Sequence, residues 1–331
     1  MFNNILIYNS GGGIGDSIQI LPLISTLRSE FKGTNFYYLS AHDNHFNSVL
    51  KDFKCEINTL NLNIKYFGFR WWHSLIIKKR IKKNNISKFD LIIDLQSKIR
   101  NSLILKMIPH EKFISSCLNF RLSKPYLELK KEKKIDKTII NSLNLLLNKN
   151  FQLKEYNIDK IDRKFFIESK RLLPKNNYVG LSITQGNIYR KKEWAFNNII
   201  KFANKLIEYK KIPVFLINKN DISLKNKINS LIPNSLFPEH ETNLASPALV
   251  TCLGTRLDFA VSIDNGIMHM LSLSKVPLIS LFGPTDSEKF GPKYEKSIIL
   301  DSKKLYNTNN VSAITVEDVL KASKQYLGFS Y

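Results

Sequence analysis

The segment Ile5-Leu6-Ile7-Tyr8-Asn9-Ser10-Gly11-Gly12-Gly13-Ile14-Gly15-Asp16-Ser17 (ILIYNSGGGIGDS) decides the fold of the first half of the chain. Its apolar run over 5–8 predicts a strand, and apolar residues at helical spacing over 17–31 predict a helix. The glycines between them indicate a tight turn that needs unusual backbone angles. In α/β folds, ligands bind beyond the carboxyl ends of the strands. The segment therefore predicts an α/β domain with a ligand site at this turn.

Asp16 limits what the turn can bind. A phosphate-binding P-loop needs lysine after its last glycine, whereas Asp16 follows Gly15 and also occupies the place of the third glycine of a dinucleotide fingerprint. A carboxylate here would repel a pyrophosphate, but it would suit a general base. Aspartate is also among the best helix caps, so a purely structural role is the alternative. The spacing alone leaves both interpretations open.

The alternation of strands and helices continues in two blocks along the chain, separated by a charged region over 118–174 with a predicted helix over 136–148. This rhythm is typical of parallel sheets covered by helices. Two α/β halves imply two domains with a cleft between them, which also fits a length of 331 residues. The first block has predicted strands over 35–39, 57–60 and 89–95 and helices over 43–53 and 71–83. The second has strands over 178–184, 212–217, 259–263 and 277–282 and helices over 195–209, 222–231, 245–253 and 266–274.

Composition excludes several classes of protein. With 43% hydrophobic residues the chain can build two cores and is not disordered as a whole. No run reaches the roughly 18 apolar residues of a membrane-spanning helix, and the start lacks a basic segment before an apolar one, so we expect a cytoplasmic protein without a signal peptide. Three widely spaced cysteines without a CxxC motif predict buried free thiols.

The formal net charge of +22 fits several partners. Nucleic acid, an anionic membrane surface and acidic substrates all match a basic chain. Lysine, asparagine and isoleucine are abundant together throughout, and few basic runs are interleaved with aromatic residues. We therefore ascribe most of the charge to composition and expect no specific nucleic-acid partner.

The second half carries a basic loop at the end of its first strand. After the strand over 178–184, the sequence reads Thr184-Gln185-Gly186-Asn187-Ile188-Tyr189-Arg190-Lys191-Lys192-Glu193-Trp194. Clustered cations at the carboxyl end of a strand suit a diphosphate. In a chain so rich in lysine, a solvated basic loop is the competing interpretation.

A second turn in this half has the pattern of an anion site. The segment over 260–269 (AVSIDNGIMH) joins a strand, an Asp264-Asn265-Gly266 turn and a helix start. Free backbone N–H groups at a helix N-terminus favour anions, and His269 follows one turn later. Taken alone, His269 is more often a core histidine than a ligand contact. The strand over 277–282 ends near Thr285, whose hydroxyl would reach the same edge of the sheet.

Together, these motifs resemble the lipopolysaccharide heptosyltransferases, glycosyltransferase family 9. The resemblance rests on Gly13-Ile14-Gly15-Asp16, Lys192-Glu193-Trp194, and the segments 262–269 and 281–286, in this order. It implies a GT-B fold, with two Rossmann-like domains facing a central cleft. We expect an acceptor-binding domain over 1–155 and a nucleotide-sugar domain over 156–315, with the amphipathic helix over 316–328 packing back on the first domain.

The resemblance also implies an activity and a set of site residues. The activity is inverting, metal-independent transfer of a heptose from ADP-heptose to the lipopolysaccharide inner core or a related envelope glycan, without a cofactor. The sequence contains no Asp-x-Asp pair of the kind that holds a metal at a leaving diphosphate. Asparagine at 265 departs from the threonine or serine usual in the family. The expected catalytic residues are Asp16 as base and Lys192 at the diphosphate; the donor side comprises Thr184, Gln185, Arg190, Asp264, Asn265, Gly266, His269 and Thr285, and the acceptor side Gly13, Gly15 and Gln96.

The implied acceptor is an anionic glycolipid at the inner face of the cytoplasmic membrane. A local basic cluster beside Trp71 and Trp72 would suit contact with that surface. Its members are Lys78, Lys79, Arg80, Lys82 and Lys83. The alternatives are a transferase for another nucleotide sugar, a nucleotide-sugar epimerase or NAD-linked oxidoreductase of similar fold, and a non-enzymatic basic nucleic-acid binder.

Overall fold

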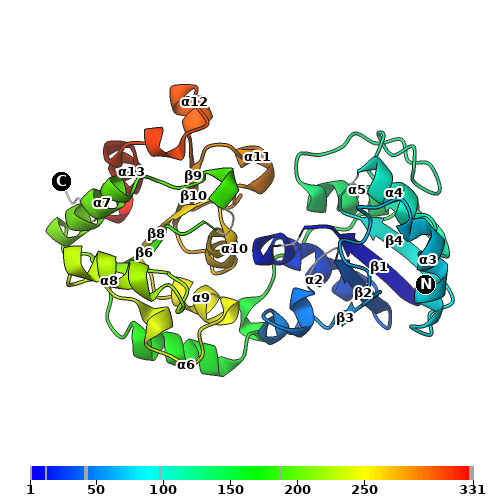
Figure 1. Cartoon of the computed structure of the whole chain (residues 1–331), viewed down its shortest axis with the longest axis horizontal. Helices are drawn as coiled ribbons and strands as arrows, with labels where there is room; N and C mark the ends of the chain where they lie inside the picture. Colours follow the sequence, from blue (N-terminus) through cyan, green and yellow to red (C-terminus); the bar gives the residue numbers. More distant parts are fainter. Residues whose placement is uncertain (1, 12, 41–43, 97, 186–187, 328–331) are drawn as a thin grey trace. The chain divides into compact units, whose positions relative to one another are not determined.

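The structure, a computed structural model, describes residues 2–11, 13–40, 44–96, 98–185 and 188–327. The chain divides into two compact units, Met1–Asn157 and Ile158–Tyr331 (Figure 1). The division falls close to the boundary expected after residue 155. Each unit is an α/β domain built around its own parallel sheet.

The first unit has a five-stranded sheet in the order β3-β2-β1-β4-β5, and all its strand pairs are parallel. The middle strand is β1, which is buried along most of its length. The glycine-rich turn therefore lies at the centre of the sheet's carboxyl edge. The strands are β1 Asn4–Asn9, β2 Asn35–Ser40, β3 Asn58–Thr59, β4 Phe89–Asp94 and β5 His110–Ser115.

Helices cover the first sheet, and two of them differ from expectation. The predicted helix over 17–31 is split into α1 and α2, because Pro22 lies in the first turn of α2, where it has no N–H to continue the earlier helix. The predicted helix over 43–53 is wrong: residues 45–47 and 51–53 form short 3₁₀ turns. The polar side chains of Asn44 and Ser48 bond to nearby backbone there and compete with helical bonds. The helices are α1 Ile14–Ile18, α2 Leu21–Glu30, α3 His73–Lys82, α4 Ile99–Leu105 and α5 Ile135–Leu147.

The second unit repeats this plan with a parallel sheet in the order β10-β9-β8-β6-β7. Its middle strand, β8, ends at the Asp264-Asn265-Gly266 turn. Beyond β7, Leu236 pairs in parallel with Val214 and extends the edge of the sheet. The strands are β6 Tyr178–Ser182, β7 Ile212–Phe215, β8 Phe259–Ile263, β9 Leu278–Phe282 and β10 Ser297–Asp301. The helices are α6 Arg163–Leu172, α7 Phe196–Glu208, α8 Ile222–Leu231, α9 Pro247–Gly254, α10 Gly266–Leu273, α11 Ser287–Phe290, α12 Ser302–Tyr306 and α13 Val316–Ser323.

The last helix corrects one expectation. Residues 316–328 were expected to pack back on the first domain, but α13 belongs to the second unit. Val316 and Val319 are buried in the same hydrophobic cluster as Phe202 and Leu206 of α7. The amphipathic pattern correctly indicated one buried face, and the second unit's own core covers that face.

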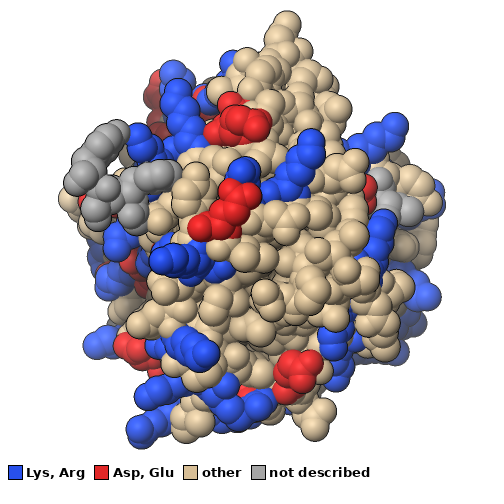
Figure 2. Space-filling view, turned by 90° about the vertical axis from the view of Figure 1, so that its left-hand side faces the viewer, with Lys and Arg blue, Asp and Glu red and all other residues tan. Residues whose placement is uncertain are grey.

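Other sequence expectations can be compared with the described residues. Cys117 and Cys252 are buried free thiols, whereas Cys55, which also forms no disulfide, is only half-buried. Among the described residues, no helix combines the length and the apolar character that crossing a bilayer requires. On the side of the second unit that Figure 2 shows, basic side chains are spread over the face, with a few acidic groups among them.

Candidate active site

Asp16 lies at the carboxyl edge of the first sheet, as the third residue of α1. Its backbone N–H donates to the Gly13 carbonyl at 3.1 Å, and its Oδ2 accepts a hydrogen bond from the Gly13 N–H at 3.2 Å. A Cβ at Gly11 would lie 2.6 Å from the Cβ of Asp16, so only glycine permits this approach. The other oxygen, Oδ1, accepts no hydrogen bond from a described residue. One carboxylate oxygen of Asp16 therefore stabilises the start of α1, and the other has room for a further hydrogen bond.

Asn9 joins the turn to Gln96. The buried Asn9 side chain accepts hydrogen bonds from the Gly11 N–H at 2.9 Å and from Nε2 of Gln96 at 2.8 Å. Its Nδ2 donates to the carbonyl of Asp16 at 3.2 Å. The structure thus brings Gln96, Asp16 and the turn of Gly13 and Gly15 together at one edge.

A buried carboxylate holds the loop that carries Gln96. Asp94, which ends β4, is fully buried and accepts hydrogen bonds from Ser102 at 2.5 Å, from Ser115 at 2.8 Å and from the Gln96 N–H at 2.9 Å. Neither Asp94 nor Asn9 was predicted from the sequence. Their shared signal is a polar residue directly after an apolar run, which covers 5–8 before Asn9 and 91–93 before Asp94.

In the second unit, Lys192 forms an ion pair with the buried carboxylate of Asp264. The Lys192 Nζ lies 2.5 Å from Oδ2 of Asp264 and donates to the Asp264 carbonyl at 3.1 Å, and the side chains are only 13% and 7% exposed. Thr285 donates to the same carboxylate oxygen at 2.7 Å. Lys192, predicted at the diphosphate, therefore meets the predicted donor-side residues Asp264 and Thr285 directly after the middle strand of this sheet.

Asn265 organises the start of α10 beside this pair. Its Oδ1 accepts from the Met268 N–H at 2.9 Å and caps the helix. Its Nδ2 donates to Ser182 at 2.7 Å and to the Thr184 carbonyl at 2.8 Å, which ties the ends of β6 and β8 together. Threonine or serine could cap the helix but has no second donor for this link. The Asn265 amide therefore caps α10 with its oxygen and links β6 to β8 with its nitrogen.

The remaining predicted residues surround this centre in different ways. Gln185 accepts from the Lys192 N–H at 2.9 Å and fixes the basic loop, and Arg190 is exposed on a 3₁₀ turn. Gly266 is the first residue of α10. His269 follows three residues later in the same helix, and its side chain is buried. Gly186 and Asn187 lie outside the described residues.

Glu239 lies at the outer end of the same sheet edge and was not predicted. It follows the segment that pairs with β7, is 8% exposed, and its Oε2 meets no hydrogen-bond partner among the described residues. Burial raises the pKa of Glu239 to about 8. The carboxyl is therefore neutral at pH 7.

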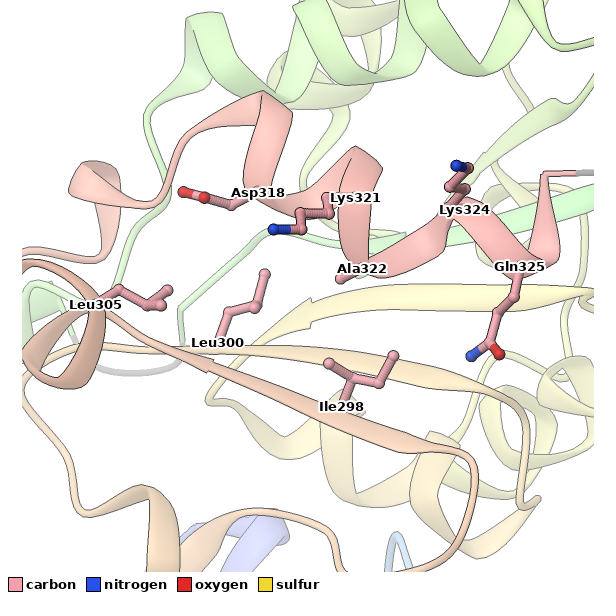
Figure 3. A pocket seen from close by; sticks show the side chains of 8 residues that line it. All are labelled: Ile298, Leu300, Leu305, Asp318, Lys321, Ala322, Lys324 and Gln325. Atoms are coloured by element: carbon pink, nitrogen blue, oxygen red, sulfur yellow. The ribbon is translucent and has the colours of Figure 1, made fainter. Parts of the chain in front are cut away.

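A groove of about 740 Å³ is separate from the predicted site (Figure 3). It lies between β10 and the last helices of the second unit, with apolar Ile298, Leu300 and Leu305 on one side and Lys321 and Lys324 on the other. None of the residues that line it belongs to the predicted donor set.

Comparison with known proteins supplies the family. The sequence model of glycosyltransferase family 9 (heptosyltransferase) matches residues 76–320. Lipopolysaccharide heptosyltransferase 1 of Campylobacter coli is 23% identical over 348 aligned positions, which cover 95% of this chain and 96% of that protein.

Solved structures share the fold across both units. The family 9 glycosyltransferase of Veillonella parvula superposes with a TM-score of 0.69 at 16% identity, covering 98% of this chain and 97% of its own. The Escherichia coli heptosyltransferase WaaC, solved with ADP, gives a TM-score of 0.67 at 13% identity, covering 98% and 99%. The chain therefore has the GT-B fold, as expected.

Proposed function

Because the chain belongs to glycosyltransferase family 9, the heptosyltransferases, and is thus a glycosyltransferase, we propose that it transfers a heptose from ADP-heptose to the lipopolysaccharide inner core. The observation that carries the proposal is the ion pair between Lys192 and buried Asp264 at the N-terminus of α10. The name of the Campylobacter relative and the ADP bound to the E. coli enzyme support the acceptor and the donor.

The proposed reaction is a single displacement with inversion. An acceptor hydroxyl attacks the anomeric carbon of the heptose, a new C–O bond forms, and the bond to the diphosphate breaks. The hydroxyl proton passes to Asp16, whose Oδ1 accepts no hydrogen bond from a described residue. Gly13, Gly15 and Gln96 bind the acceptor around this carboxylate.

The leaving ADP carries the electron pair of the broken bond and needs stabilisation. Lys192 supplies a positive charge, and the N–H groups at the start of α10 supply a preorganised dipole. When the diphosphate binds, Lys192 shares its charge between Asp264 and the phosphate oxygens, while Thr285 holds Asp264 in place. Thr184, Gln185, Arg190, Gly266 and His269 complete the proposed donor side.

No cofactor or metal has a part in the proposed reaction. The cationic and N–H groups named above neutralise the diphosphate, which is the task a divalent ion performs in other transferases. The enzyme works in the cytoplasm, and its acceptor is presented at the inner face of the membrane.

The test is a panel of donors with a lipid acceptor. Purified protein is incubated with ADP-heptose, ADP-glucose, UDP-N-acetylglucosamine or NAD, with and without EDTA, and nucleotide release and acceptor mass are measured. We expect release of ADP and a mass gain of one heptose from ADP-heptose alone, unaffected by EDTA. Transfer from another sugar, or loss of activity in EDTA, would overturn the corresponding part of the proposal.

A further inference from the structure

The outward face of α3 carries large apolar side chains beside cations. Leu75 is 83% exposed, and Trp71 and Trp72, in the turn before the helix, are 60% and 53% exposed. The opposite side of α3 is buried in the first unit's core through Ile77 and Ile81. Trp71 and Leu75 recur at helical spacing with exposed lysines at positions 78 and 82, so they form one stripe.

The neighbouring helix α4 also exposes apolar groups. Ile99 and Leu103 of α4, and Met107 just after its end, are 50%, 38% and 41% exposed and follow one another at intervals of four residues. The helices α3 and α4 contact each other, lie next to each other in Figure 1, and pack on the same core cluster. We call their outward sides, together with Trp71 and Trp72, the α3–α4 face.

The tryptophans are held on this face by a fixed turn. The Tyr8 hydroxyl donates to the carbonyl of buried Phe67 at 2.7 Å, and the Gly68 N–H donates to Nδ1 of His73 at 3.1 Å. Gly68 has φ +87°, and a Cβ there would lie 2.5 Å from the Tyr8 hydroxyl. The Trp72 ring packs edge-on against His73, with 4.3 Å between centroids. The exposure of the two indoles is therefore built into the fold.

The charge on this face has one sign. The sequence contains no aspartate or glutamate between Glu56 and Asp90, or between Asp94 and Glu111. The basic side chains of α3 and its C-terminal end form no ion pair with a described residue; these are Lys78, Lys79, Arg80, Lys82 and Lys83. The exposed indoles and leucine therefore lie among basic residues, and the segments that form α3 and α4 contribute no acidic residue.

We propose that the α3–α4 face docks the enzyme on an anionic lipid bilayer. Tryptophan is favoured where an apolar layer meets water, so Trp71, Trp72 and Leu75 enter the headgroup layer. The lysines extend their apolar stems along the surface and place their ammonium groups on lipid phosphates. The proposal deepens the proposed function, because an enzyme with a lipid acceptor must meet that lipid at a membrane surface.

The first test measures vesicle binding of the full chain. Wild type should cosediment with vesicles of phosphatidylcholine plus phosphatidylglycerol and less with phosphatidylcholine alone. Because each lysine contributes about one factor of five near an anionic surface, Lys78→Gln/Lys82→Gln should weaken binding roughly 10- to 30-fold. The control Lys170→Gln/Lys201→Gln removes the same charge from α6 and α7 and should bind like wild type. Equal weakening by both pairs would overturn the proposal.

The second test uses the tryptophans as reporters. The chain has three, and Trp194 is only 4% exposed, so Trp71 and Trp72 dominate any change on docking. Vesicles should shift their emission to the blue, and brominated lipids should quench it. Trp71→Ser/Trp72→Ser should lose this signal and bind at least about tenfold more weakly while keeping the wild-type melting temperature. Unchanged vesicle binding by this variant would overturn the proposal.

Different results would overturn the docking proposal and the proposed function. The vesicles contain neither donor nor acceptor, so docking is measured without transfer. Docking through this face without heptosyl transfer would contradict only the proposed function. Transfer to a detergent-dispersed acceptor without any vesicle binding would overturn only the docking. Capture of an acidic protein by this face, again without vesicle binding, would also overturn it.

Discussion

The middle strand of each sheet leads to a carboxylate, and the two carboxylates differ in their ion-pair and hydrogen-bond partners. The Asp16 carboxylate, after β1, accepts a hydrogen bond from the Gly13 N–H and forms no ion pair with a described residue. Asp264, after β8, is paired with Lys192 and bonded by Thr285. An unpaired carboxylate can accept a proton, whereas a neutralised one can hold a lysine for an arriving anion. The same topology thus presents an unpaired carboxylate in one unit, as the proposed base requires, and a paired one in the other, as the proposed anion site requires.

The largest effect is expected from Asp16→Asn. The amide oxygen keeps the bond from the Gly13 N–H, so the turn should remain folded, but the side chain cannot take a proton. Transfer should fall about 10²- to 10⁴-fold, while ADP affinity stays at the wild-type value. Steady-state kinetics and calorimetric titration with ADP measure the two quantities.

Glu111→Gln is the matched control for that variant. Glu111 pairs with Lys88 on the surface of the first unit, and exposed pairs of this kind contribute little to stability. Its transfer rate should equal that of wild type. Wild-type transfer by Asp16→Asn would remove the assignment of Asp16 as base.

The second largest effect is expected on ADP binding by Lys192→Gln. Loss of a charge-assisted hydrogen bond should weaken ADP binding roughly 10- to 100-fold and lower transfer as well. It also leaves Asp264 as a buried unpaired charge, which lowers the melting temperature. Adding Asp264→Asn should restore the melting temperature but not the ADP affinity. Recovery of both would mean that Lys192 serves only the fold.

A third prediction concerns the carboxyl of Glu239, which meets neither a cation nor a hydrogen-bond donor among the described residues. Because burial raises the pKa of Glu239 to about 8 from an ordinary 4.5, the folded state holds this proton while the unfolded state has already lost it. Below about pH 4.5 both states are protonated and the group costs nothing. Between there and pH 8 the free energy of unfolding should fall, by up to roughly 1.4 kcal/mol per pH unit from this group.

Glu239→Gln should remove that slope. Urea unfolding of wild type and variant at several pH values gives the difference, which should widen from pH 5 to pH 8 in favour of the variant. Glu241→Gln, at an exposed neighbour, is the control and should follow wild type. Parallel curves for wild type and Glu239→Gln would show that this carboxyl titrates normally.

The smallest effect is expected from Asn265. Asn265→Ala removes the cap of α10 and the link to Ser182, and should cost about 1–2 kcal/mol of unfolding free energy. Asn265→Ser keeps a cap and should recover roughly half of this loss. Denaturant unfolding followed by circular dichroism measures both, and equal losses would mean that the cap contributes nothing.

The sequence predicted the central strands better than the edges. The strands at the middle of each sheet are continuous apolar runs, whereas β5 and β10 were missed. Both are edge strands, and β5 begins with His110, Glu111 and Lys112 because an edge needs less burial. Helix α4 was missed for a related reason, since apolar residues on its exposed side obscure the helical period.

The contacts among the proposed site residues were predictable where these residues lie in one short segment. Asp264, Asn265 and Gly266 are adjacent in sequence, and Lys192 stands in a recognisable basic loop. The link from Asn9 to Gln96 joins residues 87 positions apart, and the burial of Glu239 depends on packing around a segment without a motif. Contacts of this kind are fixed by the tertiary fold, and local pattern does not reveal them.

The anomeric configuration of the product is the most direct test of the roles proposed for Asp16 and Lys192. The acceptor glycolipid is incubated with ADP-heptose and enzyme in EDTA, and the new linkage is assigned by NMR from its one-bond carbon–proton coupling. Direct attack, with Asp16 as base and Lys192 at the diphosphate, predicts a product whose anomeric configuration is opposite to that of the donor. A product with retained configuration would contradict this account, because it would require a second displacement that these two residues do not provide.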